Sequence, residues 1–275
     1  MQFKNRTLSF QEPHVMGILN VTPDSFSDGG QFTGVESAVS QARQMVAEGA
    51  SILDIGGEST RPGAQAVDTQ QELDRVIPVI EQVHAQLDAP ISIDTSKPDV
   101  MREAVSHGAS MINDVKALQA EGALQAASEL NVPVCLMHMK GEPRTMQQSP
   151  VYHDVVGEVK QFLLERQQAC IAAGINSDQL ILDPGFGFGK TPEHNLTLVR
   201  QLAELTSLGA PVLLGVSRKS TIGSILDVSV EKRLHGSVAL AGLAVWLGAS
   251  IIRVHDVGPT VDALKVIQAV KNTKG

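Results

Sequence analysis

The sequence predicts an α/β fold, a (β/α)8 TIM barrel preceded by an N-terminal β-hairpin, and three observations support this fold class. First, short apolar segments alternate with longer amphipathic segments eight times over about 250 residues. Second, the apolar segments are nearly continuous, which is typical of parallel strands with both faces covered. Third, no linker or change of composition interrupts the alternation, so residues 1–275 are expected to form a single domain. An open, doubly wound sheet is the remaining alternative.

The expected strands are short apolar runs, each bounded by Gly, Pro or polar residues. Residues 51–63 illustrate the pattern, because the apolar residues around Asp54 are followed by Gly56-Gly57 and a polar loop. By the same criteria, strands are expected at 14–20, 51–55, 90–94, 110–113, 133–138, 179–183, 211–216 and 250–254. The alternation within residues 3–10 predicts the hairpin, which we expect to close the bottom of the barrel.

The segments between the strands carry apolar residues three and four positions apart, as amphipathic helices do. The first, from Val35 to Val46, is followed by Gly49, and the third begins with Pro98, which is favoured in the first turn of a helix. The expected helices cover 35–46, 72–87, 98–107, 120–130, 155–173, 193–205, 220–226 with 231–247, and 261–270. Residues 22–34 and 58–69 are expected to be long polar loops that act as mobile lids.

Composition and charge exclude several classes of protein. The net charge is −8 and no basic run is present, so nucleic acid is not expected as a partner. No apolar stretch approaches the roughly 18 residues of a membrane-spanning helix, and the N-terminus does not resemble a signal peptide. The two cysteines, Cys135 and Cys170, form neither a disulfide framework nor a metal motif. We therefore expect a cytoplasmic enzyme with reduced thiols and no membrane partner.

Every expected strand ends near a residue that forms hydrogen bonds or carries a charge. These strand-end residues are Asn20, Asp54, Asp94, Asn113, His138, Asp183, Ser217 with Arg218 and Lys219, and Arg253 with His255. In a barrel the carboxyl ends of the strands meet at one face, where ligands bind. Helix caps or loop contacts would explain any one of these residues, but they are a poor explanation for polar residues at all eight ends.

The strand-end residues divide into two chemical groups. Carboxylate and amide groups, which suit a flat heterocycle bearing amino groups, come from Asp94, Asn113 and Asp183. Donors that suit phosphate or carboxylate oxygens come from Lys219, Arg253 and His255, together with Arg61 of a loop. Asn20 is neutral and suits either an anion or a hard cation such as Mg²⁺. A heterocycle site and an anion site are therefore expected side by side.

Two other patterns invite a functional interpretation that the sequence supports less well. Residues 183–191, DPGFGFGKT, resemble a phosphate-binding loop, but the spacing from Gly185 to Lys190 is one residue too short. We expect the glycines of this loop to let the backbone approach a flat ligand. Cys135 and His138 have no further Cys or His at ligand spacing, so packing in the core or at the rim is expected for both.

Several motifs resemble those of bacterial dihydropteroate synthases. They are MGILNVTPDSFSDGG from Met16, DIGGESTRPG from Asp54, SIDTSK from Ser92, LDPGFGFGK from Leu182, SRKS from Ser217 and RVH from Arg253. The similarity covers essentially the whole chain, and the motifs are specific in combination. The resemblance implies an enzyme that joins 6-hydroxymethyl-7,8-dihydropterin diphosphate to 4-aminobenzoate and releases pyrophosphate in folate biosynthesis. It also implies Mg²⁺ as cofactor, a homodimer, and sensitivity of the family to sulfonamides.

The resemblance also assigns roles to residues. It implies that the catalytic residues are Asp94, Lys219, Arg253 and His255, and that Asn20 is the metal ligand. The residues expected to hold the pterin are Asp94, Asn113, Asp183 and Lys219, with Arg253 stacked over it. Those expected at the diphosphate are Asn20, Thr60, Arg253 and His255, and those beside the 4-aminobenzoate are Phe26, Pro62, Lys219 and Ser220. The expected substrate-binding set is completed by Asp54, Arg61, Met137 and Phe188.

Two other functions remain open at this point. A methyltetrahydrofolate methyltransferase that acts with a corrinoid protein would share the pterin site but would not need two loops that close over an anion. A non-catalytic pterin-binding paralogue would keep the fold without turnover. Such a paralogue is expected to lose loop motifs such as Ser59–Pro62, which is intact in this chain.

Overall fold

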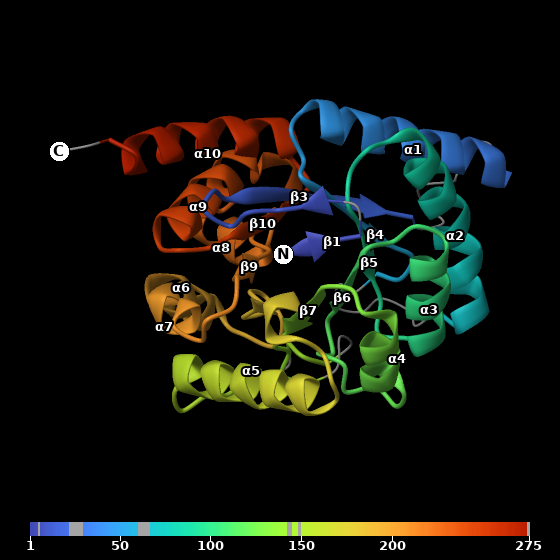
Figure 1. Cartoon of the computed structure of the whole chain (residues 1–275). Helices are drawn as coiled ribbons and strands as arrows, with labels where there is room; N and C mark the ends of the chain where they lie inside the picture. Colours follow the sequence, from blue (N-terminus) through green and yellow to red (C-terminus); the bar gives the residue numbers. More distant parts are fainter. Residues whose placement is uncertain (5, 22–29, 60–66, 142–144, 148–149, 274–275) are drawn as a thin grey trace.

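A closed ring of eight parallel strands forms the centre of the protein (Figure 1). The computed structural model describes residues 1–4, 6–21, 30–59, 67–141, 145–147 and 150–273. The barrel strands are β3 (His14–Asn20), β4 (Ile52–Gly56), β5 (Ile91–Asp94), β6 (Met111–Asp114), β7 (Val134–Met137), β8 (Leu180–Asp183), β9 (Leu213–Leu214) and β10 (Ile251–Val254). The sheet order is β8-β7-β6-β5-β4-β3-β10-β9, and a parallel bridge between Leu182 and Val212 joins β8 to β9. This bridge closes the ring, which confirms the barrel over the open sheet.

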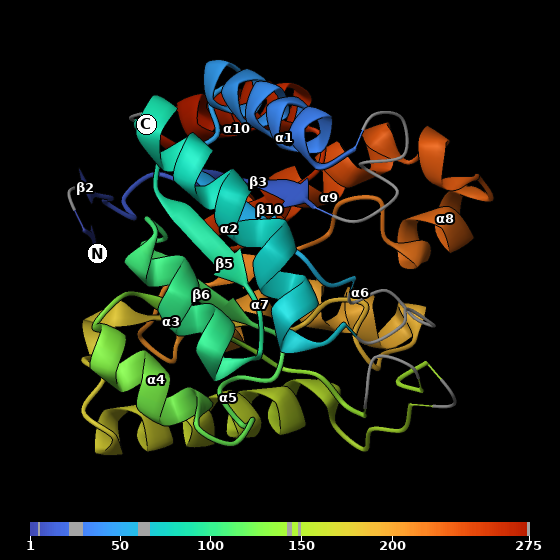
Figure 2. The ribbon, with the colours of Figure 1, turned by 90° about the vertical axis from the view of Figure 1, so that its right-hand side faces the viewer.

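Helices surround the strands on the outside of the ring (Figures 1 and 2). They are α1 (Gly30–Ala47), α2 (Thr69–Gln86), α3 (Pro98–Ser106), α4 (Ala123–Leu130), α5 (Val155–Ala172), α6 (Pro192–Arg200), α7 (Leu202–Thr206), α8 (Ser220–Leu226), α9 (Leu234–Trp246) and α10 (Val257–Lys271). Two 3₁₀ turns lie at Ser177–Gln179 and Val230–Lys232. Over the described part of the chain, no helix is both long enough and apolar enough to cross a membrane.

Several boundaries differ from those predicted. The first long helix begins at Gly30 instead of Val35, because two glycines weaken the local helix signal there without preventing helix formation. Residues 30–34 are therefore not part of a lid loop, and residues 22–29 lie outside the described residues. The strand expected at 211–216 is reduced to Leu213–Leu214, since Pro211 has no N–H to donate and β10 pairs with these two residues alone.

Two of the later helical predictions, at 193–205 and 231–247, divide in the structure. The helix expected at 193–205 is interrupted at Gln201, whose backbone angles (φ −109°, ψ 27°) are not helical, so it forms α6 and α7. The helix expected at 231–247 starts as the 3₁₀ turn Val230–Lys232 and becomes α9 at Leu234. Most other boundaries agree with the prediction to within a few residues, which is the usual uncertainty for helix and strand ends.

The N-terminal hairpin closes the bottom of the barrel, as predicted. Strand β1 (Gln2–Phe3) pairs antiparallel with β2 (Arg6–Thr7), and Figure 1 shows β1 in the middle of the ring. Figure 2 shows the hairpin at the end from which the barrel strands start. Phe3 is 2% exposed and belongs to an apolar cluster inside the barrel. The other members of this cluster are Met16, Ile52, Met111, Cys135, Ile181, Leu213 and Ile251.

The period of two along a strand places the polar side chains directly above this apolar cluster. Inward-facing Ile52, Met111 and Ile251 are each followed two positions later by a polar residue of the same strand. The polar residues reached in this way include Asp54, Asn113, Asp183 and Arg253. A parallel barrel has all these positions at the carboxyl ends of its strands, so the fold itself gathers them at one mouth. Cys135 lies in the apolar cluster, which confirms its predicted role in core packing.

Candidate active site

Arg253 of β10 lies at the centre of the polar cluster. Its Nε donates to Oδ2 of Asp54 at 2.6 Å, and its Nη2 donates to Oδ2 of Asp94 at 2.7 Å. The Nδ2 of Asn113 also donates to Oδ2 of Asp54, at 3.1 Å. All four side chains come from different strands, yet they form one connected network. The structure therefore brings together four of the predicted site residues.

One guanidinium serves two buried carboxylates in this network. Burial raises the pKa of Asp94 from 3.8 to about 7, although Arg253 opposes the shift, and the negative charge of Asp54 adds to it. Burial alone would lower the pKa of Arg253, but Asp54 and Asp94 hold it above its ordinary value. A single positive charge cannot neutralise both acids. The carboxyl group of Asp94 therefore ionises less readily than that of an ordinary aspartate in the ligand-free protein.

Asp183 of β8 and Lys219 form the other side of the cluster. The backbone N–H of Gly185 donates to Oδ1 of Asp183 at 2.7 Å. Burial raises the pKa of Asp183 to about 6, while that N–H and the charges of Lys219 and Arg253 oppose the shift. The Nζ of Lys219 lies 4.1 Å from the centre of the Phe188 ring, in cation–π geometry. Asp183 thus interacts with cations on both sides, which joins the two halves of the mouth.

Four of the remaining predicted residues lie at or just beyond the strand ends of the barrel mouth. Met137 ends β7 opposite Asp183 in the strand register and is 4% exposed. Asn20 ends β3 and is exposed, and Ser220 is the first residue of α8, as predicted. His255 follows β10, and its Nδ1 lies 3.0 Å from the Oγ of Ser217. Phe26, Thr60, Arg61 and Pro62 lie outside the described residues.

Lys190 has a structural role that the sequence did not reveal. Its side chain is 2% exposed, and its Nζ lies 2.9 Å from Nδ1 of His138. The same Nζ donates to the carbonyl oxygens of Gly185 at 3.0 Å and Phe188 at 3.1 Å. Burial lowers the pKa of Lys190 to about 7, and Asp183 opposes that shift. Lys190 therefore holds the loop after β8 together from inside, unlike the lysine of a phosphate-binding loop, which faces its ligand.

The glycines of this loop allow close contact between two stretches of backbone. A Cβ on Gly185 would lie 1.8 Å from the carbonyl oxygen of His138, and one on Gly189 would lie 2.2 Å from that of Lys140. Both glycines also have positive φ angles, of 67° and 62°. The prediction that they admit a flat ligand is wrong for these two positions, because the loop after β7 occupies the space. Gly187 is different, since a Cβ there would lie 3.2 Å from Cδ of Lys219.

Sequence reasoning also missed a partly buried cluster of ion pairs formed by Glu58, Glu72 and Lys97. Lys97 binds the carboxylates of Glu58 and Glu72, at 2.5 Å for Glu72, whose side chain is fully buried. Glu58 also accepts from the N–H of Val67, so the cluster fixes both ends of the 58–67 segment. Glu72 precedes the buried Val76 and Val79 by four and seven positions, and this helical spacing was the signal that marks it as buried.

Comparison with known proteins places the chain in a family. The family described as "Pterin binding enzyme" matches residues 16–255. A dihydropteroate synthase of Escherichia coli (strain K12) is 52% identical over 268 residues, which cover 98% of this chain and 95% of the relative. The chain belongs to the dihydropteroate synthase family.

Solved structures of dihydropteroate synthases superpose closely on the barrel. The Yersinia pestis enzyme, in a sulfonamide drug complex, has a TM-score of 0.95 at 48% identity and covers 99% of both chains. The Xanthomonas albilineans enzyme with 4-aminobenzoic acid has a TM-score of 0.92 at 54% identity, covering 97% of this chain and 96% of the other. The same enzyme in complex with 7,8-dihydropteroate has a TM-score of 0.89 at 51% identity, covering 97% of each chain.

Proposed function

We propose that this protein condenses 6-hydroxymethyl-7,8-dihydropterin diphosphate with 4-aminobenzoate, forming 7,8-dihydropteroate and pyrophosphate. The family supports this reaction, because relatives with about half their residues identical carry the synthase name. The observation that carries the proposal is the joined network at the barrel mouth. Arg253 contacts Asp54 and Asp94 on one side and interacts with Asp183 on the other. Acid groups for a heterocycle and cations for its leaving group are therefore neighbours.

The acid and amide groups suit the pterin ring. The amino and ring N–H groups of a pterin are donors, and the buried carboxylate of Asp183 and the amide of Asn113 would accept from them. Lys219 would donate to a ring acceptor while Arg253 stacks on the ring. Asp54 holds Arg253 and Asn113 in place. Met137 and Phe188 would line the apolar part of this site.

The donor groups suit the diphosphate and the 4-aminobenzoate. Arg253 uses two of its five N–H groups for carboxylates among the described residues, so three are left for phosphate oxygens. His255 would donate to the same group. Thr60 is proposed to bind the diphosphate, and Phe26, Pro62, Lys219 and Ser220 are proposed to lie beside the 4-aminobenzoate. Arg61 would donate to phosphate or carboxylate oxygens.

Mg²⁺ is proposed as the cofactor, with Asn20 as its ligand from the protein. Asn20 is exposed at the end of β3 and offers an amide oxygen, which is a hard donor. Within the described residues, no group of three or more His, Cys, Asp or Glu side chains could hold a metal ion. The single amide oxygen of Asn20 suits an ion that keeps most of its waters and also binds substrate phosphates, as Mg²⁺ commonly does. When bound, Mg²⁺ would neutralise charge on the leaving diphosphate.

The proposed mechanism needs anion holders and no strong base. The bond from the pterin methylene carbon to the diphosphate oxygen breaks, and its electron pair leaves with the diphosphate, to which Arg253 and His255 donate. The resulting cation is delocalised over the electron-rich pterin, and the ionised form of Asp94 stabilises it. The lone pair of the aniline nitrogen then forms the C–N bond, and the nitrogen loses a proton to water. That lone pair is free at neutral pH, so no base like that of a Ser-His pair is required.

A pyrophosphate-release assay tests the proposal. The expected result is release that depends on both the pterin diphosphate and 4-aminobenzoate. Methyl transfer from methyltetrahydrofolate to a corrinoid protein, without pyrophosphate release, would identify the methyltransferase instead. Binding of the pterin with no turnover would identify the non-catalytic paralogue. The relatives in this comparison favour the synthase, because those matched at about 50% identity bear that name.

Three further properties belong to this proposal. We propose a homodimer, supported by apolar side chains that α9 and α10 expose: Leu243, Trp246, Val266 and Val270. Light scattering on wild type and Trp246→Glu tests it, since the variant should be a monomer.

We propose that the protein works in the cytoplasm, in keeping with its two buried, unpaired cysteines, Cys135 and Cys170. A sulfonamide should compete with 4-aminobenzoate, as the complex of the Yersinia pestis enzyme suggests.

A further inference from the structure

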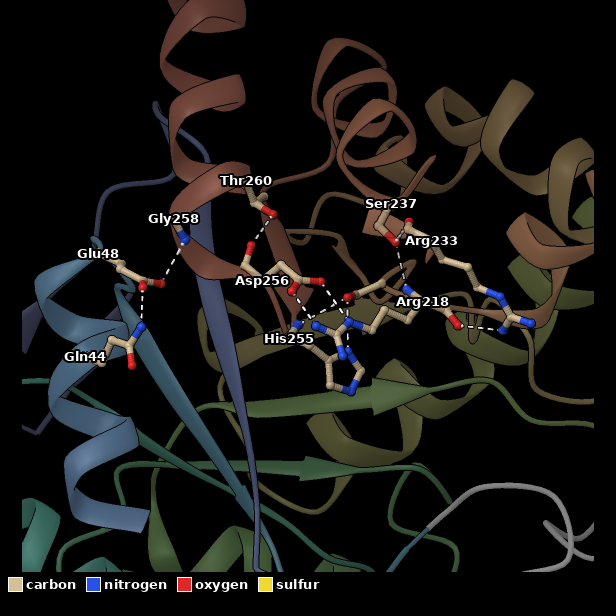
Figure 3. A network of polar contacts seen from close by, with 10 residues as sticks. Gln44, Glu48, Arg218, Arg233, Ser237, His255, Asp256, Gly258 and Thr260 are labelled. Atoms are coloured by element: carbon tan, nitrogen blue, oxygen red, sulfur yellow. Dashed lines mark hydrogen bonds and ion pairs between the residues drawn. The ribbon is translucent and has the colours of Figure 1, made fainter. Parts of the chain in front are cut away.

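Two loops at the rim of the barrel are joined by a double contact. The loop after β9 contains Ser217, Arg218 and Lys219, and the turn after β10 contains His255 and Asp256. Ser217 contacts His255, and the guanidinium of Arg218 binds Asp256 with Nε at 2.9 Å and Nη2 at 2.5 Å from its two carboxylate oxygens. Figure 3 shows Arg218 and Asp256 facing one another beside His255. The first contact includes His255, and the second joins the sequence neighbours of Lys219 and His255, both of which are proposed to bind substrate.

The Ser217 hydroxyl contacts both the backbone N–H and the Nδ1 atom of His255. Its Oγ accepts from the backbone N–H of His255 at 3.1 Å and lies 3.0 Å from Nδ1. A hydroxyl has one proton to donate, and Nδ1 is its one acceptor among the described residues. Donation from Ser217 to Nδ1 would place the proton of the neutral imidazole on Nε2. Ser217 is 4% exposed, so water does not compete for this bond.

Arg218 adopts a backbone conformation that normally favours glycine. Its φ is +55°, in the left-handed region. Its N–H donates to Oγ of Ser237 at 2.9 Å, and its carbonyl accepts from Nη1 of Arg233 at 3.0 Å. The ion pair with Asp256 is a third restraint. This tight turn separates Ser217, which reaches His255, from Lys219, which reaches the Phe188 ring.

Asp256 is available to Arg218 because another residue caps its helix. Asp256 precedes α10, where an aspartate usually accepts from the first N–H groups of the helix, but here its side chain forms no such bond. Glu48, just beyond α1, accepts from the N–H of Gly258 at 3.0 Å instead, and Gln44 donates to Glu48 at 2.8 Å (Figure 3). The carboxylate of Asp256 therefore binds Arg218 and not the N-terminus of α10.

We propose that Ser217, Arg218 and Asp256 are positioning residues for the condensation, and this inference rests on the proposed function. They join the two loops so that Lys219 and His255 keep a fixed separation, with the Nε2–H of His255 set by Ser217. Neither Arg218 nor Asp256 needs to touch a substrate for this role. The bidentate geometry of the pair provides direction as well as attraction, which a single-point contact would not.

The test compares Asp256→Asn, Arg218→Met and their double variant with a matched control. The control is Arg102→Met, because Arg102 forms an ion pair with Glu129 at 3.0 Å between α3 and α4, away from the barrel mouth. For each protein, kcat and both KM values come from pyrophosphate release. The affinity for the pterin diphosphate comes from calorimetry, and the melting temperature shows whether each variant folds.

Each single variant should lower kcat about 10- to 100-fold, with little change in melting temperature or in the affinity for the pterin diphosphate. The double variant should lose no more than the worse single variant, because the pair acts as a unit. Arg218→Lys should recover only part of the loss, because lysine keeps the positive charge but cannot form the two parallel hydrogen bonds of a guanidinium. Values of kcat within twofold of wild type, as expected for Arg102→Met, would overturn the proposal. So would losses that add in the double variant.

The Ser217 part is tested by nitrogen NMR of the eight histidines, with the His255 signals assigned from their loss in His255→Gln. In the wild type, His255 should show an unprotonated Nδ1 and a protonated Nε2, and Ser217→Ala should mix the two tautomers. An unchanged His255 spectrum in Ser217→Ala would overturn this part. A wild type that binds the pterin diphosphate but releases no pyrophosphate would instead refute the proposed function, while the spectra still decide the role of Ser217.

Discussion

The Nε of Arg253 donates to Oδ2 of Asp54 at 2.6 Å, although 199 positions separate the two residues in the sequence. The contact joins β10 to β4 across the inside of the barrel. The second carboxylate on the same guanidinium, Asp94, lies on β5. Two carboxylates, from β4 and β5, thus share the single positive charge of Arg253 from β10. The excess of negative charge at the mouth destabilises the folded protein, but it can also stabilise a bound cation.

Asp94→Asn should lower turnover by more than about 10²-fold, because the amide cannot supply the charge that stabilises the developing cation. Arg253 keeps its contact with Asp54, so the site should stay assembled. Pyrophosphate release under saturating substrates measures the effect, and Asp99→Asn on the exposed face of α3 is the control. Near-normal turnover of Asp94→Asn would rule out the role.

The same substitution should change how stability depends on pH. Asp94 and Asp183 have pKa values of about 7 and about 6 in the folded protein, both raised from 3.8 by burial. The folded state therefore binds protons more tightly than the unfolded state between about pH 4 and 7. The free energy of unfolding falls as the pH rises through that window.

Asp94→Asn removes one of the two carboxyl groups that bind a proton more tightly in the folded protein. The variant should gain stability relative to the wild type as the pH is raised from 5 to 8. Urea unfolding of both proteins at the two pH values measures the difference. A difference that does not change with pH would show that Asp94 ionises normally in the folded protein.

Lys219→Ala should weaken binding of the pterin diphosphate by about tenfold or more, because it removes a charged donor next to Asp183. It also removes the cation–π contact that orders the Phe188 ring. Calorimetry without 4-aminobenzoate measures the affinity. Lys160→Ala, which breaks an exposed pair with Glu204 at 2.9 Å, should bind normally. Equal affinity of the two variants would contradict the role of Lys219.

The sequence was sufficient for those parts of the site that depend on short-range regularities. The period of two along a strand and the common direction of the strands brought Asp54, Asp94, Asn113 and Arg253 to one mouth. Neither regularity depends on which residues touch across the barrel. The partners of each side chain, such as the two acids on Arg253, depend on strand order and register, which appear only in the closed structure.

Residues whose role depends on distant backbone were interpreted wrongly or missed. The glycines before Lys190 suggested access for a ligand, but the nearby backbone belongs to His138 and Lys140, some fifty positions earlier in the chain. Asp256 was not identified, because its partner Arg218 lies 38 positions earlier and the local sequence does not indicate the pair. Nor did the local sequence indicate Glu48, which accepts from the N–H of Gly258 and is separated from it by 210 positions.

Removal of residues 1–11 should lower the melting temperature, because Phe3 fills the bottom of the barrel and Met1, Leu8 and Phe10 pack around it. Phe3→Ala alone should cost about 3 kcal/mol of unfolding free energy, typical of a buried aromatic residue. Arg6→Ala is the control in the same hairpin, because its ion pair with Asp88 is exposed and worth little. An unchanged melting curve for the truncated protein would show that the hairpin is not a plug.

Lys190→Met should destabilise the protein and loosen the site at the same time. Methionine matches lysine in length but cannot donate, so the carbonyls of Gly185 and Phe188 would lose their buried partner, at a cost of about 2 kcal/mol. Because Phe188 is then less well held against Lys219, the KM for the pterin diphosphate should also rise. Lys140→Met is the matched control, since Lys140 also binds a carbonyl, of Val151 at 2.6 Å, but is exposed. If urea unfolding gave the two variants equal stability and steady-state kinetics gave them equal KM values, the buried bonds of Lys190 would contribute no more than the exposed bonds of Lys140.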